Sequence, residues 1–368
     1  MQILQTFAGL FSNFGNLTWQ MVVMWVIGGL LIYLAIVKKM EPSLLLPMGF
    51  GAILVNLPLS GAITQGDTVG PISALFEAGM SNELFPLLLF IGIGAMIDFG
   101  PLLEKPWLML FGAAAQFGIF ITLVLAGLFF DLPDAASIAV IGAADGPTAI
   151  FVANSLGSKY LGAIMVAAYS YMALVPIVQP PVIKLCTTRK ERLIRMPYKK
   201  GSVTKTTKIL FPIVVTVLAG LLMFGNLLRE CGVLNALSET AQNVLANLIT
   251  IVLGLTVAGQ MTADKFVQPD TLLILALGLV AFVFDTVGGV LFAKLLNLFL
   301  PEGKKINPMI GAAGISAFPM SGRVVNQMGL AEDNQNFLLM YSISVNVSGQ
   351  IASVIAGGLI LTLMNGYV

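Results

Sequence analysis

The chain has 368 residues, of which 57% are hydrophobic and only 10% are charged, and its net charge is +1. A soluble globular protein carries about 25% charged residues, so this composition excludes an ordinary soluble protein. Histidine is absent from the sequence, which excludes Ser-His-Asp triads, histidine metal sites and histidine proton relays. Cys186 and Cys231 form no CxxC motif and are too few for a disulfide framework.

The first 19 residues contain no lysine or arginine. A secretory signal requires a basic segment at its start, so we predict no cleaved signal peptide. We interpret residues 1–40 as a short interfacial segment followed by one extra N-terminal span.

Apolar segments of bilayer-spanning length recur from this point to the end of the chain. They predict about eleven transmembrane helices and therefore an all-α polytopic membrane protein. The predicted spans cover roughly residues 20–37, 45–60, 85–102, 107–131, 137–157, 160–184, 209–228, 243–262, 270–299, 306–329 and 335–364.

One loop is hydrophilic, KLCTTRKERLIRMPYKKGSVTKTTK, which ends at Lys208. It contains nine of the 19 basic residues and a single acid, Glu191. The positive-inside rule places such a loop in the cytoplasm. A topogenic role explains residues 185–208 fully, and docking of a soluble partner is a second role that the sequence leaves open.

Two stretches of the sequence resemble each other, IGAADGPTAIFVANSLG at 141–157 and IGAAGISAFPMSGRVVNQMG at 310–329. Both begin with Ile-Gly-Ala-Ala, contain a proline and close on Val-x-Asn-x-x-Gly. They lie in two predicted five-span repeats, 41–184 and 209–368, and an odd number of crossings inverts the second repeat relative to the first. Inverted repeats with helices interrupted by glycine and proline are typical of transporters that bind their substrate at mid-membrane.

The Asp-Gly-Pro sequence of the first stretch places Asp145 inside an apolar segment. Glycine and proline interrupt a helix, and the freed backbone groups can line an ion site. A carboxylate within the membrane is costly and requires a partner such as a cation or a proton. We therefore interpret Asp145 as a cation ligand at an unwound turn, and the alternative is a helix N-cap.

The second stretch supplies neutral oxygens and one positive charge. Asn307 and Gly311 lie four residues apart on one face, and Ser316 and Arg323 share a face beyond the expected break. For Asn307 and Ser316 the alternative is hydrogen bonding between helices. A guanidinium within the membrane needs a carboxylate or phosphate partner, so Arg323 either pairs with an internal acid or holds an anionic substrate.

The last predicted span carries a polar stripe, because Ser342, Asn346 and Gln350 lie four residues apart on an otherwise apolar helix. Sodium is a hard cation, and hard cations take oxygen ligands from carboxylate, amide, hydroxyl and carbonyl groups. Both repeats can supply such oxygens to one sodium site, from Asp145, Asn307, Ser316 and Asn346.

Proton transfer in a chain without histidine must use a carboxylic acid, a tyrosine, a lysine or water. Tyr169 and Tyr171 lie in the span that follows Asp145. A buried tyrosine hydroxyl usually forms a hydrogen bond and nothing more, but here it is a candidate proton donor. Asp98 and Asp285 are further acids in apolar segments, and either is a packing partner for Arg323 or part of an ion path.

Three segments closely resemble the β subunit of the biotin-dependent, sodium-pumping decarboxylases, the family of the oxaloacetate, methylmalonyl-CoA, glutaconyl-CoA and malonate enzymes. They are GAADGPTAIF, NPMIGAAGISAFPMSGRVVNQ and EPSLLLPMGFGAILVNLP, and the likeness covers nearly the whole chain. It implies a membrane subunit that decarboxylates carboxybiotin, exports sodium and consumes an external proton. The family's first motif often reads GGADGPT where this chain has GAADGPT.

The resemblance also implies partners and a location. The partners are a carboxyltransferase α subunit, a biotin carrier protein that supplies carboxybiotin in trans, and small membrane-anchoring subunits. The chain is expected to be a homotrimer, embedded in lipid as a multi-pass protein of the bacterial inner membrane, with no nucleic-acid partner.

Residue by residue, the family's essential aspartate falls on Asp145 and its essential tyrosine on Tyr171. The polar set of its second broken helix and of the next span falls on Asn307, Gly311, Ser316, Arg323 and Asn346. The resemblance implies that Tyr171 and Arg323 bind carboxybiotin and act in catalysis with Asp145. The implied sodium ligands are Asp145, Asn307, Gly311, Ser316 and Asn346.

Two other functions compete with the decarboxylase, and one of them fits the same composition and spacing equally well. A sodium-coupled secondary transporter, either a sodium/proton antiporter or an anion symporter, also has inverted repeats, broken helices and a single buried aspartate. An assembly scaffold for a membrane complex is the third alternative, and it explains none of the broken helices. Only the identity of the motifs favours the decarboxylase over the transporter.

Overall fold

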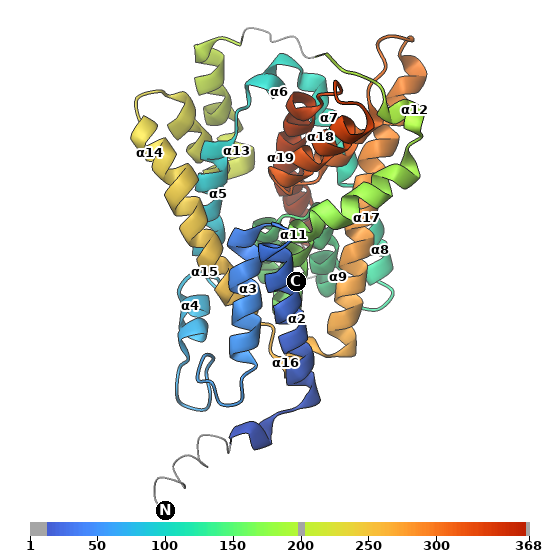
Figure 1. Cartoon of the computed structure of the whole chain (residues 1–368). Helices are drawn as coiled ribbons and strands as arrows, with labels where there is room; N and C mark the ends of the chain where they lie inside the picture. Colours follow the sequence, from blue (N-terminus) through green and yellow to red (C-terminus); the bar gives the residue numbers. More distant parts are fainter. Residues whose placement is uncertain (1–12, 198–202, 366–368) are drawn as a thin grey trace, which may run out of the picture. The chain divides into compact units, whose positions relative to one another are not determined.

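The computed structural model of the protein describes residues 13–197 and 203–365, and every regular element within these ranges is helical (Figure 1). The chain forms two compact units, Met1–Phe85 with Asn247–Leu273 and Pro86–Ala246 with Ile274–Val368. Each unit combines segments from both predicted repeats. The predicted interfacial segment lies mostly in residues 1–12, outside the described residues.

The first unit contains two helices in close contact, α2 (Trp19–Ile36) and α3 (Pro42–Val55). A Cβ atom on Gly28 or on Gly49 would lie 2.7 Å from the carbonyl oxygen of the other residue. Glycine at both positions therefore lets the two backbones approach each other. The unit also contains η1 (Asn13–Asn16), α4 (Pro71–Gly79), most of α15 (Ala246–Ala258) and α16 (Ala263–Phe266).

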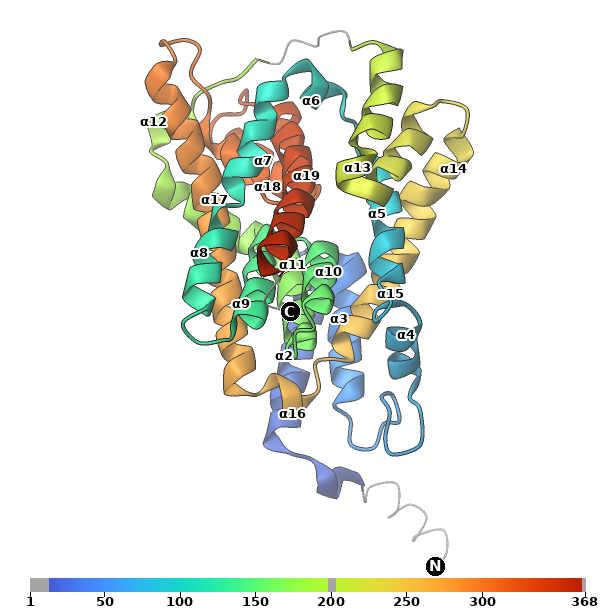
Figure 2. The same ribbon diagram turned by 180° about the vertical axis from the view of Figure 1, so that it is seen from behind.

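The second unit holds most of α5 (Leu84–Met96), then α6 (Gly100–Glu104), η2 (Pro106–Leu108), α7 (Met109–Ala115), α8 (Phe117–Ala126), α9 (Leu132–Ala139), η3 (Val140–Ala143), α10 (Gly146–Ser155), α11 (Leu161–Cys186), α12 (Arg189–Arg192), α13 (Lys205–Glu230), α14 (Asn235–Thr240), η4 (Ala241–Leu245), most of α17 (Pro269–Phe299), η5 (Pro308–Gly314), α18 (Met320–Glu332) and α19 (Leu339–Met364). Helix α19 is central, because it packs on α7, η5, α18 and α10 (Figure 2). Its many serine and glycine residues permit this: a Cβ atom on Gly349 would collide with the carbonyl of Gly314.

Six helical segments within the described ranges are long and apolar enough to span a bilayer, or seven if α4 and α5 count as one broken span. The prediction of a polytopic helical membrane protein is therefore confirmed, but the continuous spans are fewer than the eleven predicted. The predicted span 45–60 is the 14-residue helix α3. The predicted spans 137–157 and 306–329 are each interrupted, so neither crosses as one helix.

Both segments that were predicted to break are broken. In the first, η3 ends at Ala143, the backbone of the following Ala144 is left-handed (φ 51°, ψ 41°), and α10 begins after Asp145. Pro147 stands in the first turn of α10, where its missing N–H costs nothing. In the second, η5 is followed by extended backbone at Ile315 (φ −71°, ψ 152°), and α18 begins only at Met320. We call residues 143–145 the first break and residues 315–319 the second break.

Candidate functional site

Asp145 occupies the N-cap position of α10, and only 3% of its surface is exposed. Its Oδ2 accepts hydrogen bonds from the hydroxyls of Thr148, at 2.6 Å, and Ser353, at 2.8 Å. No described lysine or arginine lies within ion-pair distance of it. The position fits the N-cap alternative, but two hydroxyls from separate helices hold the carboxylate.

The second break meets the first break directly. The backbone N–H of Ser316 donates to the carbonyl of Ala143 at 2.9 Å, and the Ser316 hydroxyl donates to the carbonyl of Gly349 on α19 at 2.9 Å. The amide of Asn346 donates to the Ile315 carbonyl at 2.7 Å, and the amide of Gln350 donates to the Ser316 carbonyl. The structure thus brings Ser316 to the segment that carries Asp145 and Asn346 to the neighbouring Ile315.

The amide groups of α19 leave acceptor oxygens unused. Asn346 Oδ1 and Gln350 Oε1 are buried and have no hydrogen-bond partner in the described structure. Asn346, Gln350 and Ser353 are spaced by four and three residues, so they follow one face of α19 from the second break to Asp145. A buried acceptor without a donor is costly, and a cation would satisfy such oxygens and the buried carboxylate together.

The two candidate tyrosines on α11 lie in different surroundings. A Cβ atom on Gly146 would lie within 3 Å of the Tyr169 ring, and the buried Tyr169 hydroxyl has no partner in the described structure. The Tyr171 hydroxyl donates to the carbonyl of Leu275 on α17, and its ring stacks on Phe282. The structure therefore puts the Tyr169 ring, rather than the Tyr171 ring, beside the Asp145 turn.

Gly311 and Arg323 differ in burial. Gly311 packs against Gly289 of α17 so closely that a Cβ atom on either would collide with the other's carbonyl. Arg323 is exposed on α18, and no described acid lies within ion-pair distance of it. Its pairing with an internal acid is thus absent from the described structure, which leaves the guanidinium accessible to an anion.

Asn307 is buried and contacts residues 187–197, which we call the strap. Its amide nitrogen donates to the carbonyls of Arg192 and Ile194, at 2.9 Å each, and its Oδ1 accepts from the N–H of Met309. Asn336 donates to the same Arg192 carbonyl at 2.8 Å. The structure shows no contact between Asn307 and Asp145.

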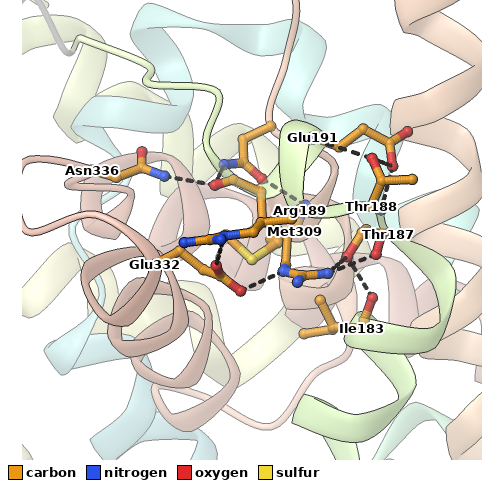
Figure 3. Close-up of polar contacts among 10 residues, drawn as sticks. Ile183, Thr187, Thr188, Arg189, Glu191, Met309, Glu332 and Asn336 are labelled. Atoms are coloured by element: carbon orange, nitrogen blue, oxygen red, sulfur yellow. Dashed lines mark hydrogen bonds and ion pairs between the residues drawn. The ribbon is translucent and has the colours of Figure 1, made fainter.

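Ion pairs fix the strap to the end of α18. The Arg192 Nε lies 2.6 Å from Glu332 Oε1, with both side chains largely buried, and its Nη1 donates to the carbonyl of Thr187 (Figure 3). Arg195 pairs with Asp333, and this hydrogen-bonded contact lowers the pKa of the Asp333 carboxyl. Residues 187–197 of the hydrophilic loop thus form a cover over the second broken segment.

The two remaining acids have other partners than Arg323. Asp98 lies 3.0 Å from Lys208 Nζ, and its Oδ1 also accepts from the N–H of Gly100. Asp285 is fully buried on α17 and accepts from the backbone of α8. Neither acid contacts Asp145.

Sequence reasoning missed Thr148 and Ser353, the two residues that hold Asp145. Ser353 continues the stripe of Asn346 and Gln350 by three residues, so helical spacing was a usable signal. Ser342, which was counted in that stripe, donates instead to the Gly322 carbonyl of α18 and to its own helix.

Comparison with known proteins identifies the family. The model of the "Na+-transporting oxaloacetate decarboxylase beta subunit" matches residues 20–364. The chain is 44% identical to the oxaloacetate decarboxylase beta chain of Klebsiella pneumoniae, over 92% of this chain and 94% of the relative. It is 46% identical to the glutaconyl-CoA decarboxylase subunit beta of Acidaminococcus fermentans, with 96% of each chain covered. It is also 46% identical to the methylmalonyl-CoA decarboxylase subunit beta of Veillonella parvula, over 97% and 96%. The chain therefore belongs to the family of the β subunits of sodium-transporting decarboxylases.

Proposed function

We propose that this chain is the membrane subunit of a sodium-translocating decarboxylase, which decarboxylates carboxybiotin and couples this reaction to sodium export with uptake of an external proton. The observation that carries the proposal is the meeting of both breaks with α19 at Asp145, a buried carboxylate without a cationic partner among the described side chains. The family membership and the names of the relatives support the same activity.

Sodium is the transported substrate in this proposal. Asp145 would neutralise its charge, and Ser316 and Asn346 would supply oxygens from the second break and α19. The buried, unbonded Oδ1 of Asn346 fits this role. Gly311 would contribute a backbone oxygen. Asn307 would join the ligands only after the strap carbonyls release its amide.

Carboxybiotin, carried by a biotin carrier protein, would present a carboxylate on a ureido nitrogen, and loss of CO2 leaves that nitrogen in need of a proton. Arg323 is exposed and can hold an anionic carboxylate. Tyr171 is the proposed proton donor, and its hydroxyl must leave the Leu275 carbonyl to act. Tyr169, with an unbonded hydroxyl beside the Asp145 turn, is the second candidate donor.

The proposal includes the two inverted five-helix repeats, because paired broken helices at corresponding sequence positions support alternating access to one site. It also includes a carboxyltransferase α subunit, the carrier protein and small membrane-anchoring subunits, assembled on a trimer in the bacterial inner membrane. Membership of the β-subunit family supports a complex of several subunits.

Reconstitution of the complex into lipid vesicles tests the proposal. We expect the wild type to release CO2 from carboxybiotin and to move radioactive sodium only while decarboxylation proceeds. Asp145→Asn should abolish both while the complex still assembles, because it removes the only negative charge at the breaks. Sodium movement without decarboxylation would identify a secondary transporter, and full activity of Asp145→Asn would support a scaffold.

A further inference from the structure

Asp285 is a buried acid that the proposed reaction does not use. It lies in the middle of α17, in the sequence AFVFDTVGG, and its surface is 0% exposed. No lysine or arginine of the described chain lies within ion-pair distance of it. A charged carboxylate in this position would be costly within the membrane. The hydrogen bonds of its two oxygens therefore indicate which protonation state the site favours.

The two carboxyl oxygens of Asp285 differ in their hydrogen-bond partners. Oδ1 accepts hydrogen bonds from the N–H groups of Gly118 and Ile119, the latter at 3.2 Å, in the first turn of α8. Oδ2 is buried and has no hydrogen-bond partner in the described structure. A Cβ atom on Gly142 would lie 2.7 Å from Oδ2, so this oxygen faces η3 at the first break.

A neutral carboxylic acid suits this arrangement better than a carboxylate, because an unpaired hydroxyl costs less in an apolar site than an unpaired negative charge. The carbonyl oxygen of an acid has two lone pairs, which match the two amide donors at Oδ1. The acid proton then resides on Oδ2, the oxygen that lacks a donor. An ionised group would instead leave Oδ2 as an uncompensated acceptor among small apolar neighbours such as Ala281.

We propose that Asp285 is a second proton-binding carboxylate, held neutral against the first break, and that loss of its proton favours a cation at Asp145. Asp145 follows Gly142 by three residues in the same broken segment. Tyr171 is a further titratable group close to α17, because its ring stacks on Phe282, three residues before Asp285. Helices α7 and α8 contribute no charged residue. A negative charge at Asp285 would strengthen cation binding at Asp145, and the linkage is reciprocal.

Infrared spectroscopy of the complete complex in lipid tests the neutral state without any assay of turnover. We expect a carboxylic-acid carbonyl band at neutral pH that shifts in D2O and disappears in Asp285→Asn, a change that keeps an acceptor for both α8 amides. Asp333→Asn, at a surface ion pair, is the control and should leave the band unchanged. An identical band in wild type and Asp285→Asn would overturn the proposal. If Asp285→Asn fails to fold, Asp285→Glu replaces it, and an unshifted band would overturn the proposal equally.

The link to sodium rests on the proposed function and has its own measurement. The sodium concentration for half-maximal decarboxylation should fall as the pH rises in the wild type. In Asp285→Asn, which cannot ionise, we expect the same rise in pH to change this sodium concentration by a factor at least about five-fold smaller than in the wild type. Equal pH dependence in both proteins would overturn the link. Failure of sodium to stimulate the wild type would overturn the proposed function, while the infrared band would still decide the state of Asp285.

Discussion

Asn346 offers a buried amide oxygen at the point where α19 meets the second break. Replacement by alanine removes one neutral oxygen from the proposed sodium site. We expect the sodium concentration for half-maximal decarboxylation to rise roughly five- to thirty-fold in Asn346→Ala, the equivalent of about 1–2 kcal/mol for one polar contact to a charge. Sodium titration of CO2 release measures this shift.

Ser344→Ala is the matched control for Asn346→Ala. Ser344 lies two residues earlier on α19, and its hydroxyl donates only to the Met340 carbonyl of its own helix. Its sodium requirement should equal that of the wild type. If Asn346→Ala and Ser316→Ala both keep the wild-type requirement, the cation binds elsewhere.

The two tyrosines of α11 can be separated by removal of one hydroxyl at a time. If Tyr171 delivers the proton, Tyr171→Phe should lower the decarboxylation rate by about two orders of magnitude or more, the size of a general-acid contribution, with little change in sodium affinity. Tyr169→Phe should then remain active. Single-turnover CO2 release measures both, and an inactive Tyr169→Phe beside an active Tyr171→Phe would reverse the assignment.

The candidate site was only partly predictable from single residues. Asp145 could be found because Asp-Gly-Pro inside an apolar segment is costly without a function. Ser353 could not be paired with it, since that contact joins residues 208 positions apart, whereas Thr148 lies only three residues from Asp145 and was overlooked. Asn307 was interpreted as a sodium ligand, but its bonds to the strap depend on a tertiary contact that its sequence position does not reveal.

At the scale of elements, the strap should be held closed by its pair with α18. In Glu332→Ala the guanidinium of Arg192 loses its largely buried partner. We expect tryptic cleavage within residues 187–197 to become about ten-fold faster, the equivalent of about 1.4 kcal/mol. Glu302→Ala is the control, because its 95% exposed side chain pairs with Lys305 at 3.8 Å and contributes little. Equal cleavage rates in both variants would show that the pair does not secure the strap.

The strap should also respond to acid. The hydrogen bond from Arg195 lowers the pKa of Asp333. At Glu191 partial burial opposes the shift, but hydrogen bonds from Thr188 and Lys294 lower its pKa. Carboxyls with a depressed pKa in the folded state stabilise it above their unfolded values and lose this contribution as the pH falls. The protection of the backbone amides of residues 188–196 against hydrogen exchange should therefore persist down to about pH 4 and decrease below it. A loss of protection already between about pH 5 and 6 would contradict this.

The elements of the fold were predictable to different degrees. The two breaks followed from glycine and proline inside apolar segments, as the turn at Ala144 and the extended backbone at Ile315 show. The number of spans was overestimated, because hydropathy counts apolar length and does not register that α3 stops after 14 residues. The strap was predicted only as part of a basic loop, since its acidic partners lie about 140 residues further along the chain.

At the scale of the whole molecule, the chain should work only within a complex. Avidin affinity purification from the source membrane should recover it together with a biotinylated carrier and a carboxyltransferase. Sodium should stimulate consumption of one carboxylic substrate among oxaloacetate, glutaconyl-CoA, methylmalonyl-CoA and malonate. Native mass spectrometry of the membrane subunit should show three copies. Absence of a biotinylated partner would contradict the decarboxylase assignment, and a monomer would contradict the trimer.

The hydrogen bond from the Ser316 N–H to the Ala143 carbonyl, at 2.9 Å, ties the two breaks together without any side chain. No substitution that preserves the backbone removes it, apart from proline at position 316. The backbones of the two interrupted segments are therefore coupled directly. A motion that delivers an ion to the opposite side of the membrane either moves both segments together as one body or separates them by breaking this hydrogen bond.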